Sequence, residues 1–319
     1  MDRRRFLKQA FLASTLNPFS LASEAAPGPE IAFTFDDPGT EGGAHLKWQD
    51  VNGRILDALA GNRLRSILFV CGMRVDSKPG RNLVRAWDDA GHLIGNHSYS
   101  HLYFNASEEA HAGQVAEVTL SKFETDALRN EPLIREFTHF TRLFRFPFFK
   151  EGDTAAKRDG MRLFLREHGY RIGRATIDAS DWAIDSRLRN RVAADRNADL
   201  AGYREFFLEH IWERAQFYDS LAQRVAGRRV RHTVVLHHNA LNAMYLGDLA
   251  AMFREKGWRL IDAEYAYRDP LYDLQPKTLP AGESLIWGLA KESARFENEL
   301  RYPGEDDVYE NPRMDALKL

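Results

Sequence analysis

The chain has 319 residues, of which 44% are hydrophobic and 28% are charged, a balance typical of a globular protein with one large core or two small ones. Its 44 Lys and Arg residues against 46 Asp and Glu residues give a net charge of −2, which excludes an overall attraction to nucleic acid or to an anionic membrane. A single cysteine, Cys71, excludes an intramolecular disulfide and any zinc site built on several cysteines.

The first 28 residues follow the order of an export signal. A basic run at residues 3–5 and the tripeptide Phe-Leu-Lys precede a weakly apolar stretch, and small residues surround Ala25. This order resembles the twin-arginine signal, so we expect a signal peptide over residues 1–28, passage through the twin-arginine export machinery, and a periplasmic or extracellular location. A basic N-terminal helix of a cytoplasmic protein is the alternative interpretation. In the rest of the chain, no apolar run approaches the ~20 residues of a membrane-spanning helix.

From residue 30 onward, short apolar runs alternate with segments of helical spacing. The predicted strands cover residues 31–35, 66–70, 92–95, 143–146, 170–177, 233–237 and 258–261. The predicted helices cover residues 48–59, 83–90, 107–128, 161–168, 203–225 and 246–256. Strands that alternate with helices predict parallel βαβ units, and seven of them favour closure into an α/β barrel over an open sheet.

We expect one domain over residues 29–267, since this region shows no internal repeat and no low-complexity run. Residues 268–319 are rich in Pro, Gly and charge, which indicates a C-terminal extension that packs on the domain or trails from it. No basic stretch carries interleaved aromatic residues, so a nucleic-acid partner is not expected. The sequence carries no signal for an oligomeric state.

Polar side chains follow five of the predicted strands at the point where each strand ends. In parallel α/β folds the carboxyl ends of the strands meet on one side, so these clusters are expected to converge on one site. The clusters are Asp36 with Asp37, residues 97–101, Arg145, residues 178–182, and His237 with His238.

His97 and His101 are four residues apart, a spacing that would place both imidazoles on one side of a helical turn and let them share a metal ion. One carboxylate would complete a set of two histidines and an aspartate that leaves positions open for water and substrate. Because adjacent side chains diverge, one of Asp36 and Asp37 can bind the metal while the other acts as a base. Each pair alone is a weak signal, and only the joint arrangement favours catalysis.

These residues resemble, in order, the five motifs of the family 4 carbohydrate esterases, the polysaccharide deacetylases with the NodB homology domain. The resemblance extends over residues 30–265, and it implies a distorted (β/α)7 barrel of the polysaccharide deacetylase type. The motifs lie at residues 34–37, 91–101, 145–148, 178–182 and 235–237.

The resemblance also implies a set of metal ligands and a base. Asp37, His97 and His101 would hold a divalent metal, in the first place Zn²⁺, with Co²⁺, Ni²⁺ or Mn²⁺ as alternatives. Asp36 would be the general base that activates the attacking water, and Arg145 would pair with Asp36 and hold it in place.

A second set of roles follows from the same resemblance. His237 would be the general acid for the leaving amine, and Asp181 would pair with it and keep it protonated. Trp182 would form one apolar wall of the groove, and the backbone amide of Phe148 would be the second donor to the oxyanion.

Two departures from the family pattern stand close to these residues. Pro38 follows Asp37 where glycine is usual, and a proline biases the residue before it toward an extended backbone. His238 stands where an acidic residue is common, so it is a second candidate for the role of His237.

The expected function is metal-dependent removal of acetyl groups from N-acetylated amino sugars of a polysaccharide, such as peptidoglycan, a chitin-like polymer or an exopolysaccharide. The expected partner is therefore a carbohydrate polymer or oligomer. One alternative keeps the site and changes the substrate to a non-sugar amide or an O-acetyl ester. The other is a carbohydrate-binding protein without catalysis.

Overall fold

The computed structural model describes residues 28–105, 117–302 and 307–319. The signal peptide predicted over residues 1–28 therefore lies outside the described residues except for its last position, and so does the beginning of the helix predicted over residues 107–128. In the part of the chain that the structure describes, every helix is too short or too polar to cross a membrane.

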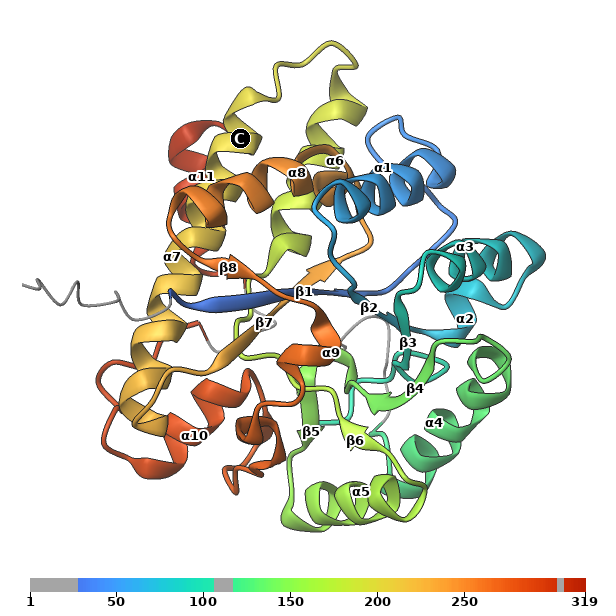
Figure 1. The fold of residues 1–319 in the computed structure, drawn as a ribbon, viewed down its shortest axis with the longest axis vertical. Helices are drawn as coiled ribbons and strands as arrows, with labels where there is room; N and C mark the ends of the chain where they lie inside the picture. Colours follow the sequence, from blue (N-terminus) through green and yellow to red (C-terminus); the bar gives the residue numbers. More distant parts are fainter. Residues whose placement is uncertain (1–27, 106–116, 303–306) are drawn as a thin grey trace, which may run out of the picture.

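A seven-stranded parallel sheet lies at the centre of the described residues, and each strand overlaps one predicted from the sequence (Figure 1). The strands are β1 (Glu30–Asp36), β2 (Ile67–Val70), β3 (Leu93–Asn96), β4 (Phe140–Phe144), β6 (Arg171–Ile172), β7 (Arg231–His237) and β8 (Arg259–Leu260). Their order is β6–β4–β3–β2–β1–β7, and β8 pairs with the beginning of β1. The α/β fold class is therefore confirmed.

The two edges of this sheet are joined by the segment that follows β6. There Ile177 forms a parallel bridge with Val234 of β7, and its backbone N–H donates to the carbonyl of Thr233 at 3.0 Å. The N–H of Val235 donates in turn to the carbonyl of Ile177 at 3.1 Å. Because β6 pairs with β4 and the next residues pair with β7, the sheet closes into the distorted barrel that was predicted.

Helices surround the barrel on its outer side (Figure 1). They are α1 (Trp48–Gly61), α2 (Gly72–Val75), α3 (Lys78–Asp89), α4 (Leu120–Ile134), α5 (Ala155–Glu167), α6 (Asp181–Ala194), α7 (Ala201–Ala226), α8 (Ala240–Glu255) and α9 (Ala263–Ala266). The side chains of α1 that face the core, Val51, Ile55 and Leu59, are almost completely buried. Burial of each such side chain contributes about 1.5–3 kcal/mol, so the helices are held mainly by their apolar faces.

Strand β1 lies in the middle of the sheet and carries the site at its end. Ile31 and Phe35 are fully buried, as expected for a parallel strand that is covered on both faces. The ring of Phe35 contacts Trp87 of α3, with ring centroids 5.3 Å apart. The hydroxyl of Thr34 donates to the carbonyl of Val234 at 2.9 Å. These contacts fix the strand whose last residue is Asp36.

Two helix predictions need correction. The helix predicted over residues 107–128 begins only at Leu120, because the hydroxyl of Thr119 accepts from the N–H of Lys122 and caps the helix there. Residues 117–119 are not helical, and the helix continues to Ile134. Helix α6 was not predicted, since no helix was expected between residues 168 and 203.

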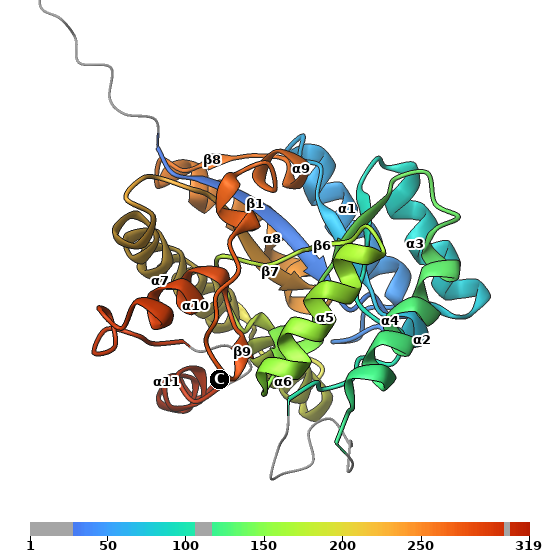
Figure 2. The same cartoon turned by 90° about the horizontal axis from the view of Figure 1, so that it is seen from below.

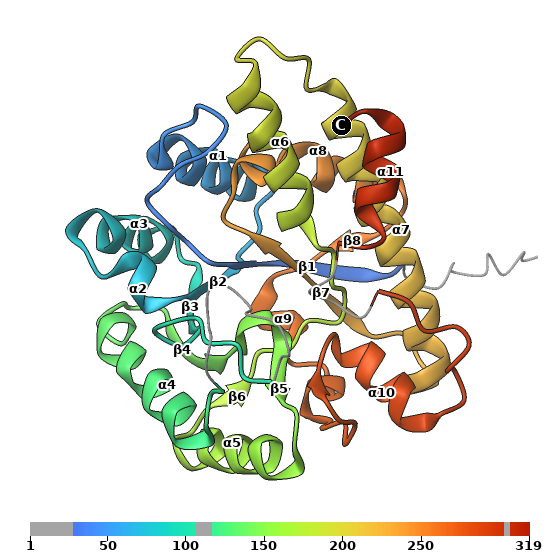
Figure 3. The same ribbon diagram turned by 180° about the vertical axis from the view of Figure 1, so that it is seen from behind.

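The segment after residue 268 packs against the barrel. It contains a short 3₁₀ helix (Pro270–Asp273), β9 (Ala281–Gly282), α10 (Leu285–Ser293) and α11 (Glu310–Leu317). Strand β9 pairs with β5 (Lys150–Gly152), and α10 lies beside α7 (Figure 2). Helix α11 lies beside α6 and α7, where its buried Glu310 pairs with Arg214 of α7 (Figure 3). The C-terminal extension therefore packs on the barrel and its helices through apolar and ionic contacts.

Candidate active site

The polar clusters predicted from the sequence come together at the carboxyl ends of the strands. Asp36 is the last residue of β1 and His237 the last residue of β7, and these two residues are register partners. His97 follows β3 directly, Arg145 follows β4, and Asp181 begins α6. Since all these strands are parallel, their ends deliver the side chains to one side of the barrel.

Asp37, His97 and His101 form a cluster that fits a metal ion. Their ligand atoms lie within 4.8 Å of one another. Oδ2 of Asp37 is 3.3 Å from Nε2 of His101, and Oδ1 is 4.0 Å from Nε2 of His97. Oδ1 is buried and accepts no hydrogen bond from the described residues, and the carboxylate as a whole faces the Nε2 atoms of both histidines. This donor set suits a divalent cation such as zinc.

The backbone prepares His97 for this role. Its Nδ1 lies 2.9 Å from the carbonyl oxygen of Arg145, an acceptor that requires the proton on Nδ1. The lone pair of Nε2 is then directed toward Asp37. Burial lowers the pKa of His97 and of His101 to about 4, so both imidazoles are neutral near pH 7, as metal ligation requires.

The segment from His97 to His101 is a loop and not the helical turn that the spacing suggested. Ser98 and His101 have φ angles of 61° and 52°. The backbone N–H of Ser100 donates to the carboxylate of Asp126 at 2.9 Å, and the N–H of Ser98 donates to Oδ1 of Asn96 at 2.9 Å. Because side chains accept from these amides, the loop needs no helical hydrogen bonds. It still places the two imidazole centroids 5.0 Å apart.

Asp37 has a φ of 58°, so the extended backbone expected before Pro38 is wrong. Proline disfavours the right-handed helical region at the preceding residue, and aspartate enters the left-handed region more readily than most residues. The left-handed turn separates two adjacent carboxylates. Asp36 points toward Arg145, whereas Asp37 points toward His97 and His101.

Asp36 is held by a fully buried arginine. Nη1 of Arg145 donates to Oδ1 of Asp36 at 2.7 Å and to the hydroxyl of Thr34 at 3.0 Å. Nε donates to the carbonyl of Gly173, and Nη2 donates to the hydroxyl of Tyr267. Burial raises the pKa of Asp36, while Arg145 opposes this increase. Tyr267 was not predicted as part of the site.

The guanidinium of Arg145 rests on the ring of Phe69, with 4.0 Å to the centroid. Two glycines make room for this ring. A Cβ on Gly95 would lie 2.7 Å from Phe69 Cδ1, and a Cβ on Gly173 would lie 2.5 Å from Cζ. Larger residues at these positions would push the ring into the arginine that orients Asp36.

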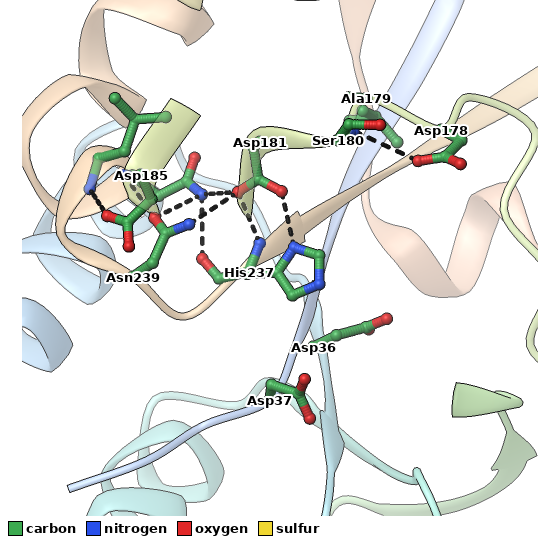
Figure 4. A network of polar contacts seen from close by, with 12 residues as sticks. Asp36, Asp37, Asp178, Ala179, Ser180, Asp181, Asp185, His237 and Asn239 are labelled. Atoms are coloured by element: carbon green, nitrogen blue, oxygen red, sulfur yellow. Dashed lines mark hydrogen bonds and ion pairs between the residues drawn. The ribbon is translucent and has the colours of Figure 1, made fainter. Parts of the chain in front are cut away.

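His237 is the charged histidine of the site. Its Nδ1 donates to Oδ1 of the fully buried Asp181 at 2.6 Å (Figure 4). Oδ2 of Asp181 accepts from the N–H of His237 and from the side-chain amides of Asn239 and Asn242. Burial lowers the pKa of His237, but Asp181 outweighs it and raises the pKa to about 10. Figure 4 shows the imidazole between Asp181 on one side and Asp36 and Asp37 on the other.

His238 differs from its neighbour. Its Nε2 lies 3.1 Å from Oδ1 of Asn52 in α1, and burial lowers its pKa to about 4. A neutral histidine cannot serve as the general acid near pH 7. Among the two adjacent histidines, the geometry therefore favours His237 for this role.

Two connected cavities form a groove over these residues. They have volumes of about 520 and 760 Å³ and share Asp37 and His101 in their lining. The smaller one is lined by aromatic residues, among them Phe146, Phe148, Phe149 and Trp182. Trp182 and Phe148, both half-buried, thus line the groove, and the ring of Phe148 is 4.4 Å from that of His101. The role of the Phe148 backbone amide as an oxyanion donor stays a prediction.

Arg74 was missed by the sequence analysis. It follows β2, and its Nε lies 3.5 Å from Oδ1 of Asp37. Arg189 of α6 also lines the groove and was missed. The position of Arg74 after a strand end was a usable signal, but three residues without charge separate it from β2.

Asp178 lines the aromatic cavity and its Oδ1 accepts from the N–H of Ser180 at 3.3 Å.

Replacement of His101 by alanine is expected to lower both metal content and thermal stability. Because a cation binds the folded chain, saturation at about 100 times Kd would add about 2.7 kcal/mol of stability, and this increment should be lost. The loss corresponds to a decrease of roughly 5–10 °C in Tm for a domain of this size. Elemental analysis and calorimetry with and without Zn²⁺ measure both effects.

His168→Ala is the matched control, because His168 lies at the exposed end of α5 and its Nδ1 contacts only the carbonyl of Phe164. It should keep its metal and the stabilisation by Zn²⁺. Unchanged metal content in His101→Ala would exclude the proposed ligand set.

A family model described as polysaccharide deacetylase matches residues 23–172 of the chain. This stretch, just under half of the chain, is thus similar to the polysaccharide deacetylase family. Two curated relatives of the chain come from Bacillus cereus, and both are named peptidoglycan-N-acetylglucosamine deacetylase. The first is 25% identical over 172 residues, which are 52% of this chain and 53% of the relative. The second is 27% identical over 197 residues, which are 59% of this chain and 79% of the relative. The chain thus spans about half the length of the first relative.

Solved structures show the same fold. A mutant of a CE4 family pseudoenzyme, described as having restored enzymatic activity, superposes with a TM-score of 0.51 at 15% identity, over 75% of this chain and 67% of the other. The wild-type pseudoenzyme, from Bacillus anthracis, has a TM-score of 0.50 at 14% identity, over 75% and 65%. Because a pseudoenzyme and its reactivated mutant match this chain equally well, fold likeness alone does not distinguish catalysis from its loss.

Proposed function

We propose that this protein is a metal-dependent hydrolase that removes acetyl groups from the N-acetylated amino sugars of a polysaccharide. One observation carries the proposal: a His₂Asp cluster, a separate carboxylate held by a buried arginine, and a cationic histidine backed by a carboxylate share one groove. The names of the curated relatives support peptidoglycan as a candidate polymer. Chitin-like polymers and exopolysaccharides are further candidates.

Asp37, His97 and His101 would hold the divalent cation. When bound there, the cation supplies Lewis acidity that polarises the amide carbonyl and acidifies water. Zn²⁺ is our first choice because two imidazoles and one carboxylate are a common zinc donor set, with Co²⁺, Ni²⁺ and Mn²⁺ as alternatives.

Asp36 is the residue that takes the proton from the attacking water. Its carboxylate is 97% buried and fixed by Arg145, so it is oriented before substrate binds. Oδ2 of Asp36 lies 3.9 Å from Nε2 of His97, so the base lies beside the cluster of Asp37, His97 and His101.

His237 is the residue that gives a proton to the leaving nitrogen. Asp181 holds the proton on Nδ1 and favours the cationic form, so Nε2 also carries a proton and faces the groove. An amine leaves poorly as an anion, so this proton matters most for an amide substrate. The backbone amide of Phe148 is our proposed second donor to the oxyanion.

The intact residue set favours an enzyme over a carbohydrate-binding protein without catalysis. Asp36, Asp37, His97, His101 and His237 are all in place, and each has the partner that its role requires. The positive charge of His237 in turn favours an amide over an O-acetyl ester as the substrate, since an alcohol leaves with less assistance from a general acid.

We also propose export through the twin-arginine machinery to the periplasm or beyond, where such polymers are found, on the basis of the basic N-terminal segment.

Acetate release tests this function. The full chain, loaded with Zn²⁺, would be incubated with N-acetylglucosamine oligomers, purified peptidoglycan and an O-acetylated glycan, each with and without a chelator. We expect acetate from an N-acetylated glycan, and its loss with the chelator. Acetate from the O-acetylated glycan alone would establish the esterase alternative. Glycan binding without acetate release would establish the non-catalytic alternative.

A further inference from the structure

Two arginines that the proposed reaction does not use lie beside the metal-ligating cluster. Arg74 lies in α2, the short helix that follows β2, and Arg189 lies in α6. Both side chains line both cavities of the groove, and these cavities meet at Asp37 and His101. Two guanidinium groups therefore stand next to the place where an acetamido group would react.

Arg74 is bound to the cluster itself. Its Nε lies 3.5 Å from Oδ1 of Asp37, and 44% of its side chain is exposed to the groove and solvent. The carboxylate of Asp37 raises the pKa of Arg74, so the guanidinium is always charged. A cation held by Asp37 would compete with Arg74 for the same carboxylate charge.

The charge of Arg189 acts on the buried carboxylate of Asp185, where it opposes the increase in pKa that burial causes, but the two groups form no ion pair. Arg189 is exposed, and it forms no hydrogen bond or ion pair with any residue that the structure describes. Asp185, one helical turn earlier, is buried and accepts from the backbone N–H of Leu241 at 3.0 Å instead. The stem of Arg189 lies against the loop after β1, where a Cβ on Gly43 would be 3.3 Å from its Cδ. The guanidinium is thus held at the groove by its stem while its five donors remain available.

The two halves of the groove differ in chemistry. One half carries Phe146, Phe148, Phe149 and Trp182, whose faces suit the apolar face of a sugar ring. The other half carries the side-chain hydroxyls of Thr40, Ser77 and Ser100 and the exposed carboxylate of Glu41, while the two arginines line both halves. A neutral glycan would offer no anion to Arg189, or to Arg74 once a cation takes over the charge of Asp37.

We propose that Arg74 and Arg189 form a subsite for a carboxylate of the substrate, so that the preferred substrate is an N-acetylated glycan with an acidic group next to the acetamido sugar. This inference rests on the proposed function, since it names the substrate class of the same groove. Guanidinium groups bind carboxylates through paired, charge-assisted hydrogen bonds, which are stronger and more directional than those to neutral groups. The carboxylate belongs either to a neighbouring uronic acid or to an ether-linked lactyl group on the sugar.

The pairing of Arg74 with Asp37 adds a thermodynamic consequence. A divalent cation at the cluster takes over the negative charge of Asp37, which leaves Arg74 without its partner. A substrate carboxylate can then replace that partner. Binding of the cation and binding of the acidic group should therefore strengthen each other by the same factor, as linkage requires.

Matched glycans test the subsite. Hyaluronan tetrasaccharide supplies a uronic acid beside N-acetylglucosamine, and a N-acetylglucosamine–N-acetylmuramic acid tetrasaccharide supplies the lactyl group. Each is compared with the same glycan after reduction of its carboxyl group to an alcohol. With the Zn²⁺-loaded full chain, we expect kcat/KM to be about tenfold or more higher for the acidic member of at least one pair.

Variants show which residues cause this preference. Arg74→Gln and Arg189→Gln should each reduce the ratio between the acidic and the reduced glycan toward one. Arg191→Gln, at an exposed position of α6 that lines neither cavity, should leave the ratio unchanged. Thermal unfolding of each variant controls for folding. Equal kcat/KM for both members of each pair in the wild-type chain, with acetate released, would overturn the subsite and leave the proposed function standing.

Calorimetry gives a readout that does not need turnover. The affinity for Zn²⁺ is measured with and without the preferred acidic glycan in the Asp36→Asn variant. We expect the glycan to increase Zn²⁺ affinity, and the double variant with Arg74→Gln to lose this coupling. If coupling is present but the wild-type chain releases no acetate, the proposed function fails and the subsite stands. If the coupling persists without Arg74, the assignment of Arg74 is overturned.

Discussion

Asp36→Asn should lower kcat by about 10²–10⁴-fold while the protein still binds its divalent cation, because this substitution removes the proton acceptor and leaves the ligand set unchanged. Asparagine preserves the shape of the side chain, and its Oδ1 can still accept from Arg145. Arg145 also keeps its bonds to Thr34, Gly173 and Tyr267, so the buried guanidinium stays hydrogen-bonded. Acetate-release kinetics, elemental analysis and Tm together measure the effect.

Asp37→Asn is the matched control at the adjacent position. Its carboxylate faces His97 and His101, so this variant should lose the cation as well as activity. If Asp36→Asn loses the cation and Asp37→Asn retains it, the roles of the two carboxylates are reversed. If Asp36→Asn retains more than a tenth of wild-type kcat, another residue takes the proton.

The fold was readable because its strands are buried on both faces. Residues 31–35 and 233–236 form unbroken apolar or β-branched runs, which is the pattern of central parallel strands, and both became neighbours in the sheet. The position of the site followed from the same reasoning. Polar residues directly after such runs have to lie at the carboxyl ends of the strands, and the structure brings Asp36, Arg145 and His237 together there.

Local backbone shape was not readable, because distant residues determine it. The spacing of His97 and His101 suggested a helical turn, yet the loop is shaped by Asp126 of α4, which accepts from the amides of Tyr99 and Ser100. Asp37 similarly adopts a left-handed backbone that no pattern around Pro38 indicated. In both cases the residue types were correctly singled out, and the conformation that unites them came from tertiary contacts.

Helix α6 shows a different kind of failure. Ile184, Leu188 and Val192 are spaced four residues apart and are buried, so a helical pattern was present. Several arginines among them made the segment look polar. The beginning of this helix places Asp181 within hydrogen-bonding distance of His237, and its middle places Arg189 at the groove. Tyr267, which supports Arg145 from the far end of the domain, had no sequence signal because its role depends on a contact 122 residues away.

Asp181→Asn is expected to lower kcat/KM at pH 8 by roughly 10²–10⁴-fold and to move the alkaline limb of its pH profile to lower pH. Asp181 raises the pKa of His237 to about 10 against the opposing effect of burial. Without this carboxylate the pKa should fall to or below the ordinary value of 6.5, so His237 would be neutral where the wild-type residue is charged.

The ion pair between Asp181 and His237 should stabilise the folded protein over a limited range of pH. The folded-state pKa of His237 lies above its unfolded value of 6.5, so the pair contributes fully below that pH and its contribution is lost as pH rises through about 10. The pKa of Asp181 is lowered, so the contribution is also lost in acid, as pH falls through its depressed folded-state value. The difference in unfolding free energy between wild type and Asp181→Asn should therefore be largest near pH 5–7 and shrink toward pH 10.

Denaturant unfolding at several pH values, together with NMR titration of the His237 imidazole, checks both effects. His238→Gln is the control, because burial lowers the pKa of His238 to about 4 and its Nε2 contacts Asn52. The His238→Gln variant should keep the alkaline limb of the pH profile at the wild-type position. If this limb moves in His238→Gln and stays in place in Asp181→Asn, the general acid is His238, and Asp181 only supports the fold.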